Sequence, residues 1–256
     1  MCIRDRFEGI PRADGRRAGD LRMVTRNDLG WIWFIPISET VTSVGVVVPR
    51  SLYTAYNGAG RHTAAETLDH FLAGAPAAAS LVAGARAVTE ARYEADYSYL
   101  HDHHAGDRYL LVGDAGAFLD PVFSTGVLLA MQSGLEAAAA LSEGLRRDDL
   151  SRARFAGYEH RLVRRYRHFR RFAVGFYDAP FRDLFLNPQG RFGLFQAVLS
   201  ILGGNWRPSL KTRLCISLFF ALVGIQRRVP VLVPALPVEQ PPPPQPGMGQ
   251  PTPGRS

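Results

Sequence analysis

The chain has 256 residues and a formal charge of +7, and 46% of its residues are hydrophobic while 21% are charged. These fractions exclude fibrous and wholly disordered proteins, and the length suffices for one large domain or two small ones. Cys2 and Cys215 are too few to form a disulfide framework, so we expect a reducing, cytoplasmic location. Lys211 is the only lysine, so the basic excess is almost entirely arginine.

Three segments near the start of the chain are rich in aromatic and β-branched residues and are separated by turn signals, which predicts an antiparallel meander. They cover residues 20–26, 30–37 and 42–48. An alanine-rich helix is predicted over residues 64–83, broken at Pro76. Residues 86–99 then predict a return to a strand.

The most informative segment covers residues 109–127, with the sequence YLLVGDAGAFLDPVFSTGV. A polar loop over residues 101–107 precedes it, and residues 109–112 predict a short buried strand. Gly113 and Gly116 allow a tight turn or the close approach of a ligand. Asp114, at the mouth of the strand, is placed to accept hydrogen bonds from a sugar hydroxyl.

A long helix is predicted to begin near Ser124 or Thr125, whose side chains can cap it, and to end near Leu145. Its unpaired N–H groups would favour an anion or an electron-rich ring, so the segment indicates a nucleotide or anion site. An ordinary strand–loop–helix connection is the alternative.

Helices dominate the rest of the chain. Residues 151–177 predict a second long helix with one apolar stripe. The stripe comprises Phe155, Tyr158, Leu162, Tyr166, Phe169, Ala173 and Phe176. Shorter helices are predicted over residues 181–186, 192–202 and 209–228. The 12-residue apolar run 214–225 is too short to cross a bilayer, which needs about 20 residues, and is expected to be buried or to rest on a membrane surface.

Three motifs in a fixed order carry a family resemblance. Gly113-Asp114-Ala115 is followed by a loop of the form FxxPxxSxG, and an earlier strand has the form WxWxIP. The residues are Phe118, Pro121, Ser124 and Gly126 in the loop, and Trp31, Trp33, Ile35 and Pro36 in the strand. The chain therefore resembles the flavin-dependent halogenases of the tryptophan halogenase type, within the FAD-dependent monooxygenase-fold enzymes.

The resemblance implies the fold class and the site. The fold would be mixed α/β or α+β, namely the C-terminal portion of a glutathione-reductase-like FAD-binding fold with an antiparallel substrate-side sheet and a C-terminal helical region. FAD would be bound by Gly113, Asp114, Ala115, Gly116, Phe118 and Pro121. A halide would be bound by Ser124, Thr125 and Gly126. Trp31 and Trp33 would line the region between flavin and substrate, with core packing as the alternative.

Two elements of the family pattern are absent from the sequence. No dinucleotide fingerprint GxGxxG follows a first strand, and no lysine precedes WxWxIP. We therefore expect the chain to be the C-terminal part of a longer enzyme that is inactive alone. The expected divisions are a non-native start at residues 1–6, a substrate-side part at 7–100, the second flavin motif at 101–147, a helical region at 148–230, and an extended, mobile proline-rich tail at 231–256.

Two charged clusters allow more than one interpretation. His101, His103 and His104, together with Asp102 and Asp107, could suggest a metal site, but adjacent histidines on one loop predict a solvated turn, and no metal is expected. Residues 152–171 hold eight arginines and one acid, Glu159. They predict a solvated helix face, or else a surface for an acidic carrier protein or anionic lipid; nucleic acid is not expected.

The function that the resemblance implies is halogenation of an electron-rich aromatic substrate, either a small molecule or one bound to a carrier protein. A flavin hydroperoxide would convert halide to hypohalous acid, and a separate flavin reductase would supply the electrons. The alternatives are an FAD-dependent hydroxylase, an isoprenoid reductase of the same fold, or an inactive remnant.

Overall fold

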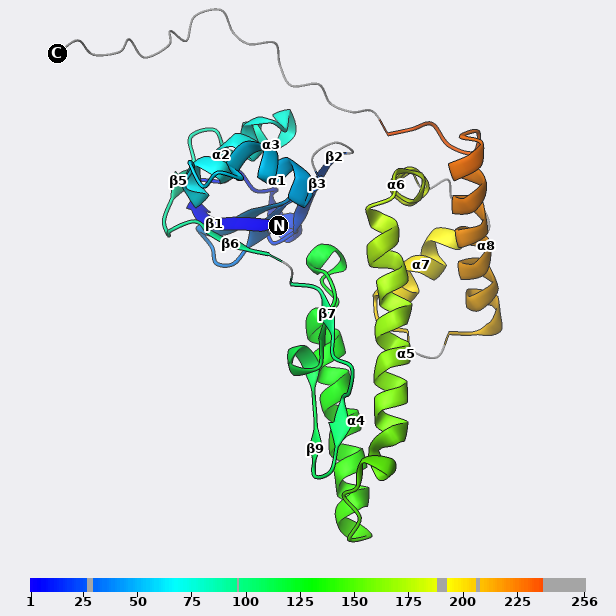
Figure 1. Ribbon diagram of the computed structural model, residues 1–256. Helices are drawn as coiled ribbons and strands as arrows, with labels where there is room; N and C mark the ends of the chain where they lie inside the picture. Colours follow the sequence, from blue (N-terminus) through cyan, green and yellow to red (C-terminus); the bar gives the residue numbers. More distant parts are fainter. Residues whose placement is uncertain (27–29, 96, 188–192, 206–207, 237–256) are drawn as a thin grey trace, which may run out of the picture. The chain divides into compact units, whose positions relative to one another are not determined.

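The computed structural model describes residues 1–26, 30–95, 97–187, 193–205 and 208–236. The chain divides into two compact units, of which the described residues up to Ala95 form the first and those from Tyr97 to Leu236 form the second (Figure 1). We describe each unit by itself. The proline-rich residues 237–256, the turn signal at residues 27–28 and the expected helix start at residue 192 lie outside the described residues.

The first unit is built on an antiparallel sheet. The predicted meander is confirmed as β2 (Arg22–Arg26), β3 (Gly30–Pro36) and β4 (Val41–Val47). β1 (Cys2–Glu8) continues the sheet beyond β4, with Ile3 opposite Val46, so the expected boundary between residues 6 and 7 falls inside a paired strand. The order is β2-β3-β4-β1-β5, where β5 is Arg86–Ala87, and β6 (Arg92–Glu94) also pairs with β1.

The expectation of one strand over residues 86–99 is wrong. That stretch contains β5, β6 and the start of β7 (Tyr99–Leu100), separated by irregular backbone. The reason is visible in the pairing, because β5 and β6 contact opposite ends of β1 and the chain has to move from one end to the other.

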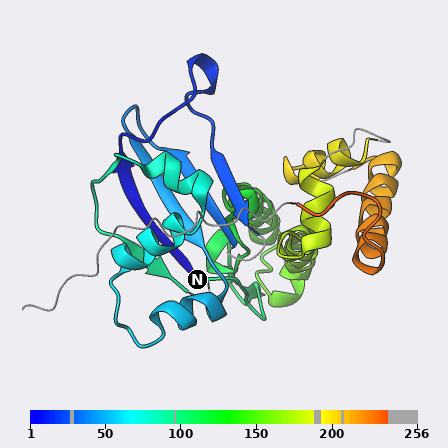
Figure 2. The same cartoon turned by 90° about the horizontal axis from the view of Figure 1, so that it is seen from above.

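Three helices cover one face of this sheet (Figure 2). They are α1 (Arg50–Asn57), which sequence analysis missed, α2 (Ala64–Ala73) and α3 (Pro76–Val82), and the predicted break at Pro76 is confirmed. Thr63 and Glu66 form a reciprocal capping box at the start of α2. Leu68, Phe71 and Leu72 of α2 pack with inward residues of the strands, and each such side chain stabilises the fold by about 1.5–3 kcal/mol.

The second unit begins with two small pairs of strands. β8 (Ala105–Gly106) pairs with β9 (Tyr109–Leu110), and β7 pairs with β10 (Ala117–Phe118). The expected buried strand over residues 109–112 is therefore only two residues long, and Tyr109 is 50% exposed. The expected loop over residues 101–107 contains β8.

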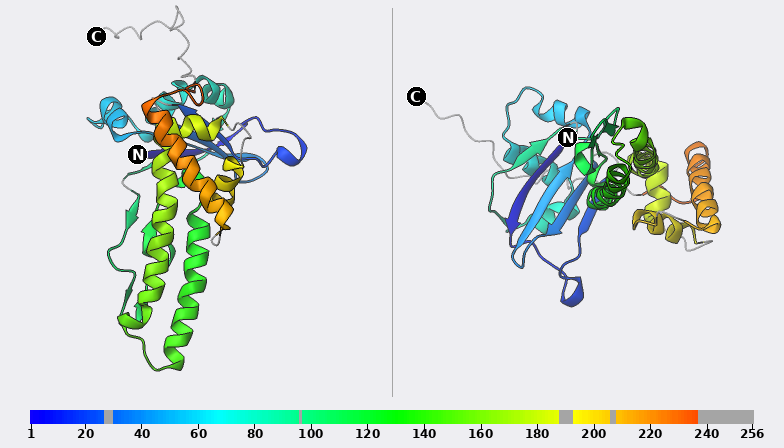
Figure 3. Two further views of the ribbon diagram at one scale, coloured as in Figure 1. Left: turned by 90° about the vertical axis from the view of Figure 1, so that its right-hand side faces the viewer. Right: turned by 90° about the horizontal axis from the view of Figure 1, so that it is seen from below.

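Two long helices, α4 (Gly126–Arg146) and α5 (Arg152–Phe176), run side by side after these strands (Figure 3). Ser151 caps α5 through its side chain. All seven residues of the predicted apolar stripe of α5 are buried. α6 (Ala179–Leu186), α7 (Leu194–Leu202) and α8 (Leu210–Arg228) complete the unit and pack through aromatic pairs such as Phe181 with Phe219.

The apolar run of residues 214–225 lies in α8, which is buried on one side only. Ile216, Phe219 and Val223 are buried, whereas Leu214 and Leu218 are exposed. Within the described ranges, no helix combines the length and the apolar character that a membrane span requires.

Candidate functional site

The loop after β9 holds Gly113 in a conformation that favours glycine. Residues Gly113–Ala115 form the short helix η2, and Gly113 has φ +56°. Its N–H group donates to Ser133 Oγ of α4 at 2.9 Å, and a Cβ built on it would lie 3.0 Å from the Ala130 Cβ. The loop therefore lies directly against α4, and a side chain at residue 113 would be both strained and crowded.

Gly116 is held by a histidine that sequence analysis assigned to a solvated turn. His104 is fully buried, its Nε2 lies 3.0 Å from the Gly116 carbonyl oxygen, and its backbone N–H donates to Glu159 at 2.6 Å. A Cβ at Gly116 would lie 2.7 Å from the His104 ring. The solvated-turn interpretation is thus wrong for His104, because the adjacent β8 turns it inward. In the described part of the chain, no group of three or more His, Cys, Asp or Glu side chains could hold a metal.

The start of α4 differs from the expected cap. Ser124 adopts a left-handed conformation with φ +52°, and Thr125 is buried. No side chain among the described residues caps the helix, so the expectation that Ser124 or Thr125 would do so is wrong. The first N–H groups of α4 have no acceptor within the helix, and they belong to Gly126 and the residues just after it. A Cβ on Gly126 would have only Phe118 nearby, at 4.0 Å.

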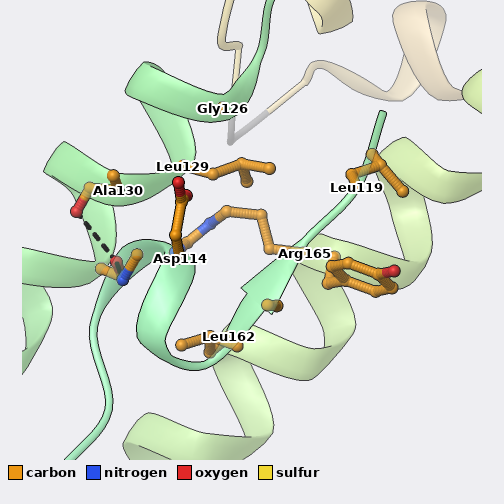
Figure 4. A pocket seen from close by; sticks show the side chains of 11 residues that line it. Asp114, Leu119, Gly126, Leu129, Ala130, Leu162 and Arg165 are labelled. Carbon is orange, nitrogen blue, oxygen red and sulfur yellow. Dashed lines mark hydrogen bonds between the residues drawn. The ribbon is translucent and has the colours of Figure 1, made fainter. Parts of the chain in front are cut away.

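The loop and the two long helices surround a small hollow, which we call the motif hollow (Figure 4). It is lined by Gly113, Asp114, Ala117, Leu119, Gly126, Leu129, Ala130, Ser133, Leu162, Arg165 and Tyr166. Asp114 extends into it from η2 and Arg165 extends into it from α5. It encloses about 30 Å³, whereas sites that enclose a whole cofactor measure about 300–1,000 Å³. The motif hollow can therefore form only one wall of such a site.

Three tyrosines of α5 and its C-terminal end form hydrogen bonds with residues 111–124, which we call the motif loop. Tyr158 donates to the Leu111 carbonyl oxygen at 2.5 Å, and Tyr166 donates to that of Phe118 at 3.4 Å. Tyr177 donates to the Asp120 carboxylate at 3.0 Å. Burial raises the pKa of the Tyr158 hydroxyl to about 12, and burial also raises the pKa of Asp120. Burial also raises the pKa of Tyr166, so the Tyr158 and Tyr166 hydroxyls stay protonated and keep donating at neutral pH.

Arg165 corrects the expectation that the arginines of α5 form a solvated face. Its side chain is 12% exposed and is paired with Glu136 of α4, which also pairs with Arg161 at 3.2 Å. Although burial opposes it, hydrogen bonds from Gln132 and Arg165 hold the pKa of Glu136 below its ordinary value. Acidic residues of α4 thus neutralise part of the positive charge of α5. Counting charges within residues 152–171 alone could not reveal this, because the acids lie on another helix.

The two tryptophans lie in the first unit, on β3. Trp31 and Trp33 are buried, with ring centroids 5.5 Å apart. Trp33 donates to Ser43 Oγ at 3.3 Å, and its ring lies over Gly45, where a Cβ would come within 2.1 Å. Their side chains point away from the sheet face that α2 covers, because β3 directs Ile32 and Phe34 toward that face.

Of the residues predicted for the site, the motif hollow brings together Gly113, Asp114 and Gly126. The other residues predicted for the second unit do not line it: Ala115, Gly116, Phe118, Pro121, Ser124 and Thr125. Pro121 begins the short helix η3 (Pro121–Phe123), whose cap is Asp120. Sequence analysis missed Ser133, Arg165 and Tyr166. Tyr166 could have been predicted, because it belongs to the apolar stripe of α5. If that stripe packs against the glycine-containing loop, the tyrosine hydroxyls on it lie close to the loop as well.

Residues 18–184 match the family model described as tryptophan halogenase. The flavin-dependent halogenase gsfI of Penicillium aethiopicum is 35% identical over 143 residues, which are 55% of this chain and 25% of that protein. The 1H-pyrrole-2-carbonyl-[peptidyl-carrier protein] chlorinase of Pseudomonas fluorescens is 36% identical over 133 residues, which are 50% of this chain and 28% of that protein. The chain thus spans less than a third of the length of these relatives.

Among solved structures, the flavin-dependent brominase Bmp2 is similar in fold. It matches with a TM-score of 0.76 and 24% identity, over 89% of this chain and 55% of the brominase. At 24% identity, this similarity is evidence for a shared fold only.

Proposed function

The chain belongs to the tryptophan halogenase family, and from that premise we propose that it supplies the flavin- and halide-facing loop of a flavin-dependent halogenase. The single observation that supports this most is the helix start at Gly126, which no side chain caps and where a Cβ would meet only Phe118. The finer fold assignment, the C-terminal portion of a glutathione-reductase-like FAD-binding fold, is part of the same proposal.

The residues of the motif hollow fit FAD. Asp114 is exposed with its carboxylate directed into the hollow, where it can accept hydrogen bonds from ribityl or ribose hydroxyls. Leu119, Leu129 and Leu162 offer an apolar wall to a ring system. Because the hollow encloses little volume, the cofactor would lie across its opening, with its other contacts made elsewhere.

The start of α4 can hold a halide. A buried anion is costly unless several N–H groups and a positive dipole end face it, and the uncapped start of α4 offers both. Gly126 leaves the approach open, and the left-handed Ser124 ends η3 just before the start of α4. Arg165, in the same hollow, offsets part of the negative charge of Asp114.

Bound FAD in its reduced form would supply, with oxygen, the oxidising power that turns halide into hypohalous acid. The protein's own share is to position the halide, to keep bulk water out and to hold the loop rigid. The loop is held rigid by Tyr158, Tyr166 and His104, each of which forms a hydrogen bond with one of its carbonyl groups. Such preorganisation matters because reactive intermediates hydrolyse when water enters.

The proposed substrate is an electron-rich aromatic ring, free or bound to a carrier protein, which hypohalous acid would halogenate. A separate flavin reductase would supply reduced flavin, and the location would be cytoplasmic. Trp31 and Trp33 are proposed to line the path from flavin to substrate.

The test uses a fusion enzyme in which the upstream segment of a related halogenase is joined to this chain. The masses of its products are measured in chloride, in bromide and without halide. We expect products shifted by chlorine in chloride, by bromine in bromide, and no product without halide. Addition of oxygen in all three buffers would instead identify a hydroxylase and contradict the proposal. A titration of FAD into this chain, followed by flavin fluorescence, tests the loop separately.

A further inference from the structure

A second, larger hollow lies on the arginine-rich side of α5, toward the end of α7 and the start of α8. We call it the arginine hollow. Arg161, Arg164, Arg165, Arg167 and Arg213 line it together with His168, and Phe169 and Ile201 form a buried apolar floor. Its volume is about 520 Å³, which is within the range of functional ligand sites. It therefore offers both positive charge and a concave shape.

The charge of the arginine hollow is only partly neutralised. Arg161 and Arg165 share the carboxylate of Glu136. Arg164, Arg167 and Arg213 are exposed, and none of them pairs with an acid within the described ranges. Three guanidinium groups around one concavity repel one another, and an anionic occupant would relieve that repulsion. Arg164 and Arg167 come from α5 and Arg213 comes from α8, so the charges of two helices line the same hollow.

We propose that the arginine hollow is the docking site for an acidic carrier protein that presents the substrate as a thioester. The inference rests on the proposed function and adds to it the place where the partner binds. Guanidinium groups form bidentate hydrogen bonds with carboxylates and phosphates, and a carrier protein has both, on its acidic helices and in the phosphodiester that anchors its prosthetic arm.

Two further observations favour a protein over a membrane or a free metabolite. Phe169 and Ile201 are buried while most of the arginines that line the hollow with them are exposed, so the hollow is concave, and a protruding part of a folded protein fits a concave site better than a flat bilayer does. The similar chlorinase of Pseudomonas fluorescens is named for a substrate on a peptidyl-carrier protein. Arginine around such a hollow also steers an acidic partner over long range.

The test measures binding of the full chain to a purified peptidyl-carrier protein in its pyrrole-2-carbonyl form, by surface plasmon resonance without flavin or halide. The variant carries Arg164→Glu, Arg167→Glu and Arg213→Glu. The matched control carries Arg16→Glu, Arg61→Glu and Arg92→Glu, three exposed arginines of the first unit, so both variants change the net charge equally. A third variant with glutamine at the three hollow positions guards against misfolding from reversed charge, and circular dichroism checks all of them.

We expect the substitutions in the arginine hollow to raise the dissociation constant at least about tenfold and to remove most of the salt dependence of binding. The control substitutions should change the dissociation constant by less than about threefold. Equal weakening by both variants, or no binding of the carrier protein by the parent chain, would overturn the proposal. Binding to phosphatidylglycerol vesicles without binding to the carrier protein would overturn it as well. Because no step needs flavin, failure here leaves the FAD titration and the halide test of the proposed function intact.

Discussion

The WxWxIP strand of the first unit and the motif loop of the second both carry the family resemblance, yet their surroundings differ in one respect. Around the strand there is no room, since a Cβ on Gly45 would lie 2.1 Å from the Trp33 ring, and Trp31 and Trp33 are 3% and 7% exposed. At the end of the loop, where α4 begins, there is room, since a Cβ on Gly126 would meet only Phe118, at 4.0 Å, whereas Gly113 and Gly116 earlier in the loop are packed against Ala130 and His104.

This difference separates stability from ligand binding. A motif residue in a filled space contributes to folding whatever else it does, because its removal leaves a cavity. A motif residue beside an open space contributes little to folding, so its presence there is better explained by a ligand. The packing interpretation of the tryptophans therefore has direct support, and their role beside the substrate stays a prediction.

The largest effect on folding is expected for Trp33→Ala. Removing a buried indole leaves a cavity over Gly45 and should lower the free energy of unfolding by about 4 kcal/mol. Denaturant unfolding followed by circular dichroism measures this. Trp33→Phe serves as the milder control, because it keeps an aromatic ring and loses the hydrogen bond to Ser43, at a cost of about 1 kcal/mol. If Trp33→Ala unfolds like the parent chain but slows halogenation, the tryptophan acts on the chemistry and the comparison fails.

Gly113→Ala should have the next largest effect. The left-handed backbone and the contact with Ala130 together should lower the free energy of unfolding by about 2 kcal/mol. Gly134→Ala on α4 is the matched control, because a Cβ there meets Val112 at an ordinary 3.7 Å and should stabilise the helix by up to about 1 kcal/mol. Equal effects of the two substitutions would mean that the loop does not lie against α4 as described.

Sequence patterns predicted the elements whose residues carry a local signal, either a regular spacing of apolar residues or a helix-breaking proline. The meander, the break at Pro76 and the buried stripe of α5 follow from alternation, from the proline ring and from a spacing of three to four residues. The inward turn of His104 and the pairing of Arg165 with Glu136 depend on contacts between residues 12 to 55 positions apart. No local pattern contains such contacts, and for this reason both residues were misassigned to solvent.

A smaller, pH-dependent effect should arise from His104. Burial lowers its pKa, although the Gly116 carbonyl and the charge of Glu159 oppose this, and its Nδ1 has no hydrogen-bond partner among the described residues. The folded state therefore keeps His104 neutral while the unfolded state takes up a proton below its ordinary value of 6.5. Stability from this group is complete above pH 6.5 and is lost as the pH falls toward the lowered pKa.

The measurement is the difference in melting temperature between the parent chain and His104→Gln at several values between pH 5 and pH 8. Glutamine can still donate to the Gly116 carbonyl but does not titrate. Subtraction cancels the other histidines with lowered pKa values, His70 and His168, because both proteins contain them. The gap between the two proteins should shrink as the pH falls through this window, and a constant gap would mean that His104 titrates normally.

The smallest effect on folding, and the sharpest test of the open loop, is expected for Gly126→Val. The first helical position tolerates a side chain, and the nearest atom to a Cβ there is 4.0 Å away, so the free energy of unfolding should change by less than about 0.5 kcal/mol. A branched side chain would nevertheless fill the approach to the uncapped N–H groups of α4, so a halide could no longer reach them. In the enzyme that joins this chain to an upstream segment, halide-dependent product should disappear, whereas Thr125→Ser, which leaves the backbone N–H groups in place, should have a mild effect. Retained halogenation by a folded Gly126→Val enzyme would place the halide elsewhere, and a loss of folding would show that the space beside Gly126 is less open than its contacts indicate.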